Sequence, residues 1–177
     1  FLLVGPPGSG KTSLAHVIAH NLGCKKIYDR HKNEICEYTQ GFLMYTVKSY
    51  TNNKLLHNLK LLTRFGCIES RITVHVFEEA HRISGNRQKQ IANIMVNAEA
   101  SCFFIFCTSF PSRIYKHIED HCKVILLGSL TQAEIVELLL QACKKEKTRV
   151  HSKVLQSIAT QSAGNPREAL KLLALET

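Results

Sequence analysis

The sequence lacks the paired cysteine spacing that is typical of a zinc site. Seven cysteines are present, but no two of them form a Cys-x-x-Cys pair. Most lie within apolar runs, where cysteine behaves as a small hydrophobic residue. We therefore expect reduced thiols, no bound zinc and an intracellular location, in the nucleus or the cytoplasm.

Long apolar runs are also missing. The longest, such as Cys102–Cys107 and Val124–Leu127, are far shorter than the roughly 20 residues that a membrane-spanning helix needs. The opening FLLVGPPG has no basic segment and no cleavage site of small residues, which indicates a buried strand and not a signal peptide. We expect no membrane partner. Because residue 1 already lies in this strand, we expect the chain to be a fragment of a longer protein.

Acidic residues are scarce. The chain has 14 Asp and Glu against 23 Lys and Arg, which gives a formal net charge of +9. Residues 1–130 hold 16 basic against 9 acidic residues and the remainder holds 7 against 5, so the excess is spread along the chain. This balance favours an anionic partner, with nucleic acid as the first candidate, over an inert basic surface. No single residue is assigned here as a DNA contact.

The hydrophobic pattern predicts an α/β fold. Strands that alternate with helices indicate a parallel sheet flanked by helices. The expected strands are Phe1–Val4, Lys26–Asp29, 71–77, 102–109 and 123–130, and the expected helices are Lys11–Leu22, Gln88–Ala98 and Ser112–Asp120, with residues 33–66 mostly helical.

The pattern changes after Leu130. Thr131 and Glu134 form a capping box at the start of a helix, and two further helical stretches follow with no strand between them. We expect residues 1–130 to form a nucleotide-binding α/β core. Residues 131–177 are expected to form a small all-helical lid, and whether that lid is truncated stays open at this point.

The segment from Gly5 to Thr12, GPPGSGKT, matches the phosphate-binding pattern G-x-x-x-x-G-K-[ST]. It follows an expected strand and opens an expected helix, which is the context that the mechanism requires. Backbone N–H groups and the helix N-terminus would hold the phosphates. Lys11 would reach the β- and γ-phosphates, and the Thr12 hydroxyl would ligate Mg²⁺.

Two carboxylates, Glu78 and Glu79, end the strand that is expected at residues 71–77. Ligands of open α/β sheets bind at the carboxyl ends of the strands. We expect Glu78 to hold the Mg²⁺ water shell and Glu79 to orient and polarise the attacking water. No N-K-x-D guanine motif is present, so a GTPase is disfavoured.

With these residues in place the chain resembles an AAA+ ATPase of the clamp-loader (replication factor C-like) and replication-initiator branch. GPPGSGKT resembles its Walker A motif and VHVFEEAH its Walker B motif. FFIFCTS resembles the strand that ends in sensor 1, which maps to Ser109 or Thr108, and AGNPREAL resembles the sensor-2 segment, where the family's arginine maps to Arg167. The resemblance implies three sets of residues. The catalytic set is Glu79, Lys11, Ser109 and Arg167, the nucleotide-binding set is Gly5, Pro6, Pro7, Gly8, Ser9, Gly10, Lys11, Thr12, Ser13 and Arg167, and the metal ligands are Thr12 and Glu78.

The chain departs from the family's pattern in three places. Glu78 replaces the usual Walker B aspartate, and His81 lies where an aspartate is common. Asp120-His121-Cys122 stands where many clamp-loader subunits carry Ser-Arg-Cys, whose arginine acts on a neighbour's ATP. Histidine lacks the charge and fork geometry of arginine. The resemblance therefore implies a subunit that receives an arginine finger without donating one, in a hetero-oligomeric ring, or else a divergent member of the family.

The resemblance implies an ATPase that uses ATP and Mg²⁺, with turnover that can depend on an oligomer. It would remodel a DNA replication or repair complex, with other AAA+ subunits, DNA and a sliding clamp as partners. Two alternatives stay open. One is an ATP-binding switch with little turnover, similar to STAND-type proteins. The other is a DEAH-like helicase fragment, although 177 residues leave no room for a second RecA-like domain.

Overall fold

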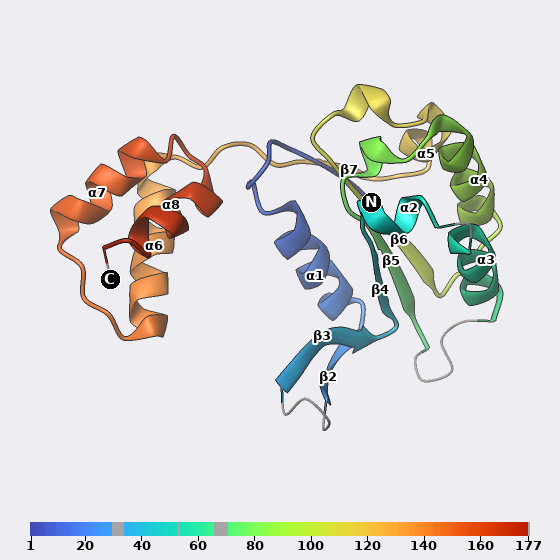
Figure 1. The fold of residues 1–177 in the computed structure, drawn as a ribbon, viewed down its shortest axis with the longest axis horizontal. Helices are drawn as coiled ribbons and strands as arrows, with labels where there is room; N and C mark the ends of the chain where they lie inside the picture. Colours follow the sequence, from blue (N-terminus) through green and yellow to red (C-terminus); the bar gives the residue numbers. More distant parts are fainter. Residues whose placement is uncertain (30–33, 53, 66–70, 177) are drawn as a thin grey trace. The chain divides into compact units, whose positions relative to one another are not determined.

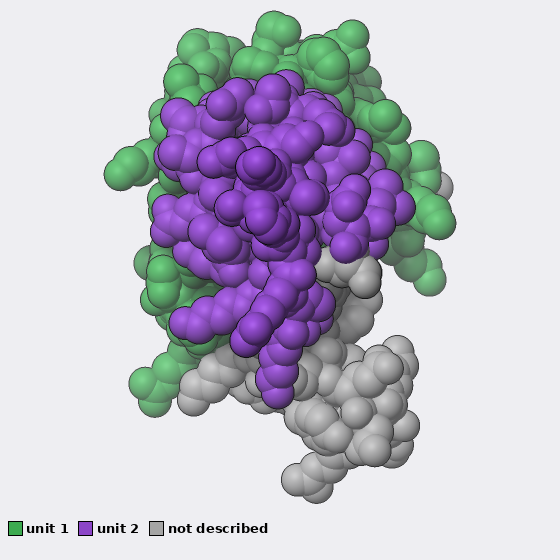
Figure 2. Space-filling model, turned by 90° about the vertical axis from the view of Figure 1, so that its left-hand side faces the viewer, with its two compact units in different colours: residues 1–4, 12–126 green, residues 5–11, 127–177 purple. Residues whose placement is uncertain are grey.

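The computed structural model describes residues 1–29, 34–52, 54–65 and 71–176 (Figure 1). They form two compact units, coloured separately in Figure 2. Unit 1 consists of Phe1–Val4 and Thr12–Leu126, and unit 2 consists of Gly5–Lys11 and Leu127–Thr177.

Unit 1 is built on a five-stranded parallel sheet with the order β4-β5-β6-β1-β7. Its strands are β1 (Leu2–Val4), β4 (Phe42–Tyr45), β5 (Thr73–Phe77), β6 (Cys102–Thr108) and β7 (Val124–Leu126). Every residue of β5 is buried, as its near-continuous apolar sequence predicts for a strand covered on both faces. The predicted parallel sheet flanked by helices is thereby confirmed.

Helices cover the sheet (Figure 1). Unit 1 contains α1 (Lys11–Asn21, whose first residue belongs to unit 2), α2 (Val47–Tyr50), α3 (Leu55–Phe65), α4 (Gly85–Val96) and α5 (Lys116–Asp120), with short 3-10 turns η1 (Ala80–Arg82) and η2 (Pro111–Arg113). The main core joins α3, α4 and α5 to one face of the sheet through residues such as Leu59, Ile91 and Ile118. On that face Phe77 stacks between Tyr45 and Phe106, with ring centroids 4.8 and 4.9 Å apart.

The expected helix over residues 33–66 is wrong in its first part. Glu34–Gln40 forms strand β3, which pairs with β2 (Lys25–Asp29) in a separate antiparallel sheet. Phe42–Tyr45 is β4, which pairs with β5 in parallel. A short apolar run such as FLMY fits a strand and a helix equally well, and pairing with a buried strand decides between them. Residues 33 and 66 and the turn residue at position 53 lie outside the described residues.

The expected helix Ser112–Asp120 is also shorter than predicted. The chain forms η2, then an extended residue at Ile114 with φ −87° and ψ 135°, and only then α5. The buried side chain of Gln88 explains the break. Its amide donates to the carbonyl of Arg113 at 3.0 Å, and its oxygen accepts from the Tyr115 N–H at 2.6 Å. These bonds satisfy backbone groups that a continuous helix would have used.

Unit 2 contains α6 (Gln132–Glu146), α7 (Ser152–Gln161) and α8 (Pro166–Leu173). They pack around their own core, which includes Ile135, Leu139, Leu155, Ile158 and Ala169. The predicted capping box is confirmed, since Thr131 Oγ1 accepts from the Glu134 N–H and the Glu134 carboxylate accepts from the Thr131 N–H at 2.7 Å. Among the helices of the described ranges, none has the length and apolar character that crossing a membrane requires.

Candidate nucleotide-binding site

The predicted site residues fall in both units. Unit 2 holds the phosphate loop from Gly5 to Lys11 and also Arg167. Unit 1 holds Thr12, Ser13, Glu78, Glu79 and Ser109. The loop and the carboxylates therefore belong to different units.

The phosphate loop has the backbone that its glycines allow. Gly8 and Gly10 adopt φ values of +84° and +89°, a region that glycine enters without steric cost. The Ser9 N–H closes a turn on the Pro6 carbonyl at 3.2 Å. Helix α1 then begins at Lys11 and has no acidic residue in its first turn. The positive end of its dipole is thus left for an anion.

Lys11 is buried against its own loop. Its Nζ donates to the carbonyls of Gly5 at 2.8 Å and Pro6 at 2.9 Å, and the residue is 7% exposed. The Ser9 hydroxyl is buried too and has no hydrogen-bond partner within the described part of the chain. A buried ammonium and an unsatisfied hydroxyl in one loop fit a phosphate, which accepts from both.

Asn165, which the sequence analysis did not single out, joins this loop to helix α8. Its Oδ1 caps α8 by accepting from the N–H groups of Arg167 at 3.1 Å and Glu168 at 3.3 Å. Its Nδ2 donates to the Pro7 carbonyl at 3.2 Å. A Cβ on Gly8 would collide with Asn165 Oδ1. An asparagine directly before a proline at a helix start is a readable N-cap signal, whereas its second contact to the loop is not.

A cavity of about 230 Å³ lies beside the loop within unit 2. It is lined by Pro6, Pro7, Ser9, Gly128, Ser129 and residues 162–166. Because pockets for drug-sized ligands start at about 300 Å³, this cavity has room for only part of a nucleotide. Arg167 follows it as an exposed residue at the start of α8.

In unit 1 the backbone of Glu78 is held from two sides. Its N–H donates to the Tyr45 carbonyl of the neighbouring strand at 2.9 Å, and its carbonyl accepts from the Tyr50 hydroxyl. Burial, with Glu78 as the next cause, raises the pKa of the Tyr50 phenol, which keeps it a hydrogen-bond donor. The Glu78 Oε1 atom is buried and finds no hydrogen-bond partner among the described residues. A buried carboxylate oxygen without a partner fits a cation or its water shell.

Glu79 occupies a strained backbone position. Its φ of 51° and ψ of 45° lie in the left-handed region, which side chains other than glycine rarely adopt. Such strain is concentrated at functional sites. The Glu79 carboxylate lies 3.2 Å from Nε2 of His81, and its side chain remains 39% exposed.

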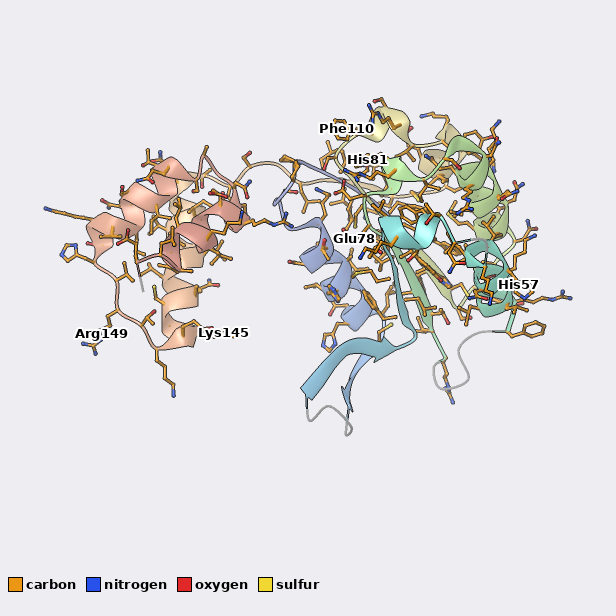
Figure 3. The ribbon with its side chains drawn as sticks, in the orientation of Figure 1. His57, Glu78, His81, Phe110, Lys145 and Arg149 are labelled. Carbon is orange, nitrogen blue, oxygen red and sulfur yellow. The ribbon has the colours of Figure 1, made fainter. Side chains whose placement is uncertain are left out.

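His81 also reaches the end of strand β6. Its Nδ1 lies 3.1 Å from the Thr108 hydroxyl, which in turn accepts from the Phe110 N–H at 3.0 Å. The Phe110 ring packs edge-on against the imidazole with centroids 4.9 Å apart (Figure 3). Of the two candidate sensor-1 residues, Thr108 is fully buried and held by His81, whereas Ser109 is partly exposed.

His121, which stands at the position of the family's arginine finger, is an exposed residue after α5. Its Nδ1 lies 2.9 Å from the His117 carbonyl, and the two imidazole rings pack with centroids 4.4 Å apart. Asp120 pairs with Lys116 at 3.4 Å. These contacts all stay within residues 116–121. The segment presents an imidazole where the family's arginine would present a guanidinium.

A parallel sheet with a phosphate loop after one strand and paired carboxylates after another defines a P-loop nucleotide-binding protein. The chain belongs to the ATPase family associated with various cellular activities (AAA), whose model matches residues 1–130. The predicted family is confirmed by this match.

Curated relatives agree with the predicted branch of the family. The chain is 25% identical over 174 residues to the replication factor C small subunit of Staphylothermus marinus, a match that covers 97% of the chain and 50% of the relative. It is 25% identical over 182 residues to the DNA polymerase III subunit tau of Bacillus subtilis, covering 98% of the chain and 32% of the relative. The chain thus spans about half or less of the length of these relatives.

Solved structures support the same fold. A point mutant of RuvB from Thermotoga maritima superimposes with a TM-score of 0.77 at 20% sequence identity, covering 98% of this chain and 53% of that one. A second RuvB mutant gives a TM-score of 0.72 at 21% identity. At this identity the likeness concerns the fold alone.

Proposed function

We propose that this chain binds ATP with Mg²⁺ and hydrolyses the ATP to ADP and phosphate. The observation that carries the proposal is the phosphate loop of unit 2, with its buried lysine and glycine-dependent turns, in a chain that belongs to an ATPase family. The carboxylates Glu78 and Glu79 at the end of β5 add the groups that hydrolysis needs.

The loop residues bind and orient the phosphates. Backbone N–H groups from Gly5 to Ser13 and the N-terminus of α1 stabilise the phosphate charges, and Lys11 contacts the β- and γ-phosphates. Thr12 would hold the metal ion through its hydroxyl, and the carboxylate of Glu78 would hold the water shell of the ion. When bound, Mg²⁺ neutralises charge on the phosphate oxygens.

Glu79 polarises the attacking water, since its side chain is 39% exposed at the end of a buried strand, whereas the Glu78 Oε1 atom is buried. Ser109 hydrogen-bonds this water or the γ-phosphate as sensor 1. Arg167 contacts the γ-phosphate as sensor 2 and distinguishes ATP from ADP. We assign residues 1–130 to the nucleotide-binding core and residues 131–177 to the lid.

The relatives named replication factor C and DNA polymerase III subunits support a role in DNA replication or repair. In this proposal the chain is one subunit of a hetero-oligomeric ring with other AAA subunits, and it couples ATP turnover to remodelling of a complex that contains DNA and a sliding clamp. The imidazole of His121 at the finger position supports a ring in which a different subunit supplies the arginine. An intracellular location, nuclear or cytoplasmic, remains a prediction.

One observation favours a second candidate, an ATP-binding switch with little turnover. His121 lacks the guanidinium fork of an arginine finger, so a ring made of this chain alone would hydrolyse ATP slowly. Turnover measured with and without candidate partner subunits separates the two. Acceleration by partners supports the ATPase, and saturating ATP binding with no turnover under any condition supports the switch.

Binding is tested with Lys11→Ala. Removing the ammonium takes away the only side-chain charge of the loop, so both ATP affinity and turnover should fall. Lys89→Ala, which removes an exposed lysine of α4, serves as the matched control. Wild-type ATP affinity and turnover in Lys11→Ala would exclude the proposed site.

A further inference from the structure

Five cations gather where helix α6 turns into helix α7. Lys144, Lys145, Lys147, Arg149 and Lys153 are all exposed, and Glu146 is the one acidic residue among positions 144–153. We call these five residues the α6–α7 basic surface. Figure 3 labels Lys145 and Arg149, which lie at the same end of the helical bundle.

The charges of this surface are not neutralised within unit 2. The ion pairs found among the described residues are Lys116 with Glu119 and Asp120, and Lys171–Glu168, and a further contact joins the His81 imidazole to the Glu79 carboxylate. None of them involves the α6–α7 basic surface. The surface is therefore a concentrated positive charge that is available to an external anion.

Helix stability explains only part of this charge. Lys144 and Lys145 lie in the last turn of α6, where cations interact favourably with the helix dipole. Lys153, by contrast, lies in the first turn of α7, which contains no acidic residue and where the dipole disfavours a cation. Lys147 has a φ of 56°, a left-handed position that favours glycine. Two of the five cations, Lys147 and Lys153, thus occupy positions that local structure does not explain.

The surface has charge but no apolar centre. None of the exposed large hydrophobic residues falls within positions 144–153, and Val150 packs against the core of the bundle. Protein interfaces are enriched in aromatic and apolar residues at their centres, and membrane-surface helices insert an apolar face. A phosphate backbone needs neither, because its binding comes from the release of counterions.

We propose that the α6–α7 basic surface binds the phosphate backbone of nucleic acid, without reading its sequence. This inference stands on the charge distribution of unit 2 alone and does not depend on ATP hydrolysis. The surface contacts phosphates through Lys147, Arg149 and Lys153 together with the two lysines at the end of α6.

The test compares two charge-matched variants of the purified protein. Lys147→Gln/Arg149→Gln/Lys153→Gln removes the three cations that lie outside the last turn of α6 and keeps the side chains long and polar. Lys116→Gln/Lys123→Gln/Lys171→Gln removes the same number of exposed cations elsewhere. Circular dichroism establishes that both variants fold. Affinity for labelled duplex DNA is then measured by fluorescence anisotropy from about 50 to 200 mM salt.

Each phosphate contact contributes about 0.9 to the slope of log affinity against log salt for duplex DNA. The first variant should therefore lower this slope by roughly 2 to 3 and weaken binding tenfold or more near 100 mM salt, independently of DNA sequence. The control variant should change the slope by less than 1. Equal slopes in both variants would overturn the proposal. The same assay is repeated with anionic vesicles and with polyglutamate. The proposal also fails if the folded first variant binds these other anions more weakly than the wild-type protein does but still binds DNA normally.

A second, independent observation concerns His81, whose imidazole joins the end of β5 to the end of β6. Its side chain is 4% exposed, so its two ring nitrogens face protein groups, namely the Glu79 carboxylate and the Thr108 hydroxyl. A carboxylate only accepts hydrogen bonds, hence Nε2 carries the proton and donates to Glu79. In the neutral ring Nδ1 then accepts from the Thr108 O–H, while the Thr108 oxygen accepts from the Phe110 N–H.

We infer that His81 is a positioning residue that holds the Glu79 carboxylate in place for catalysis. The inference rests on the proposed ATPase function, in which Glu79 polarises water. Glu79 is partly exposed and lies on a strained turn, so without His81 its side chain would sample several rotamers. Misplacement of a catalytic group by about 1 Å can lower the rate by about 10²-fold.

Turnover and ATP affinity separate positioning from folding. His81→Ala should lower kcat by roughly tenfold to a hundredfold while the affinity for ATP changes little. His81→Gln, whose amide can donate to Glu79 and accept from Thr108, should restore most of the rate. His57→Ala removes an exposed histidine of α3 and should change neither quantity (Figure 3).

Two results would contradict this inference in different ways. If wild-type protein turns ATP over and His81→Ala does so equally fast, the positioning role is wrong and the ATPase assignment stands. If wild-type protein binds ATP without turnover, even with its partner subunits, the proposed ATPase function fails and the positioning role fails with it.

Discussion

The contact between the phosphate loop and the cap of α8 makes a quantitative prediction for Gly8→Ala. An alanine at the φ of +84° adopted by Gly8 costs about 1–2 kcal/mol of backbone strain. Its Cβ would also displace Asn165 Oδ1, which caps α8 through two N–H groups. Loss of such a cap costs about 1 kcal/mol. The free energy of unfolding should therefore fall by roughly 2–3 kcal/mol.

Gly10→Ala is the matched control for this prediction. Gly10 has a similar φ of +89°, but a Cβ there would meet no atom within 4 Å. This substitution should cost only the strain of about 1–2 kcal/mol. Urea unfolding measures both losses.

A double-mutant cycle with Asn165→Ala, which removes the capping oxygen, completes the assay. In the Gly8→Ala background the cap is already displaced. The double variant should therefore lose about 1 kcal/mol less free energy of unfolding than the two single variants lose in total. With Gly10→Ala the losses should be additive. Equal destabilisation by the two alanines, together with additivity in both cycles, would refute the contact between the loop and the cap.

Three further predictions concern the core beneath the carboxylates. Burial lowers the pKa of His75 to about 4, whereas the same imidazole in the unfolded chain titrates near 6.5, so the unfolded chain takes up the proton first as the pH falls. The free energy of unfolding should therefore be full above about pH 6.5 and fall by about 2–3 kcal/mol as the pH drops towards 4. Urea unfolding of His75→Phe should show a free energy that depends less on pH. Phe77→Ala should lower the free energy of unfolding by about 3–5 kcal/mol, because Phe77 is fully buried between two aromatic rings, and a loss below 1 kcal/mol by chemical denaturation would contradict that packing. Tyr50→Phe should cost about 1–3 kcal/mol by the same measurement, since it removes the hydroxyl that donates to the Glu78 carbonyl.

Local sequence pattern was sufficient for the central parts of the fold. A glycine-rich loop between an apolar strand and an amphipathic helix places the phosphate loop, and the continuous apolar run before Glu78 predicts the buried strand β5. The strands β3 and β4 could not be predicted in the same way. Their sequences are compatible with a helix, and the long-range pairing of Phe42–Tyr45 with β5 overrides the local preference.

Side-chain contacts between residues far apart in the chain could not be predicted from the sequence either. Gln88 breaks the helix expected at Ser112–Asp120 through bonds to residues 25 and 27 positions away. Asn165 contacts Pro7 across 158 positions. Such contacts depend on how the elements fold back on each other, which no local periodicity encodes. His81 was noticed as a departure from the family's pattern, but its bonds to Glu79 and Thr108 appear only in the structure.

The most direct test of the proposed ATPase is the effect of Glu79→Gln on binding and turnover measured in one preparation. The amide keeps the size of the side chain but cannot polarise water as a carboxylate does. We predict unchanged affinity for ATP and a turnover lowered on the order of 10²-fold or more, in the presence of the partner subunits that the wild-type protein requires. Unchanged turnover in Glu79→Gln would contradict the assigned role of this carboxylate, and with it the mechanism proposed for the chain.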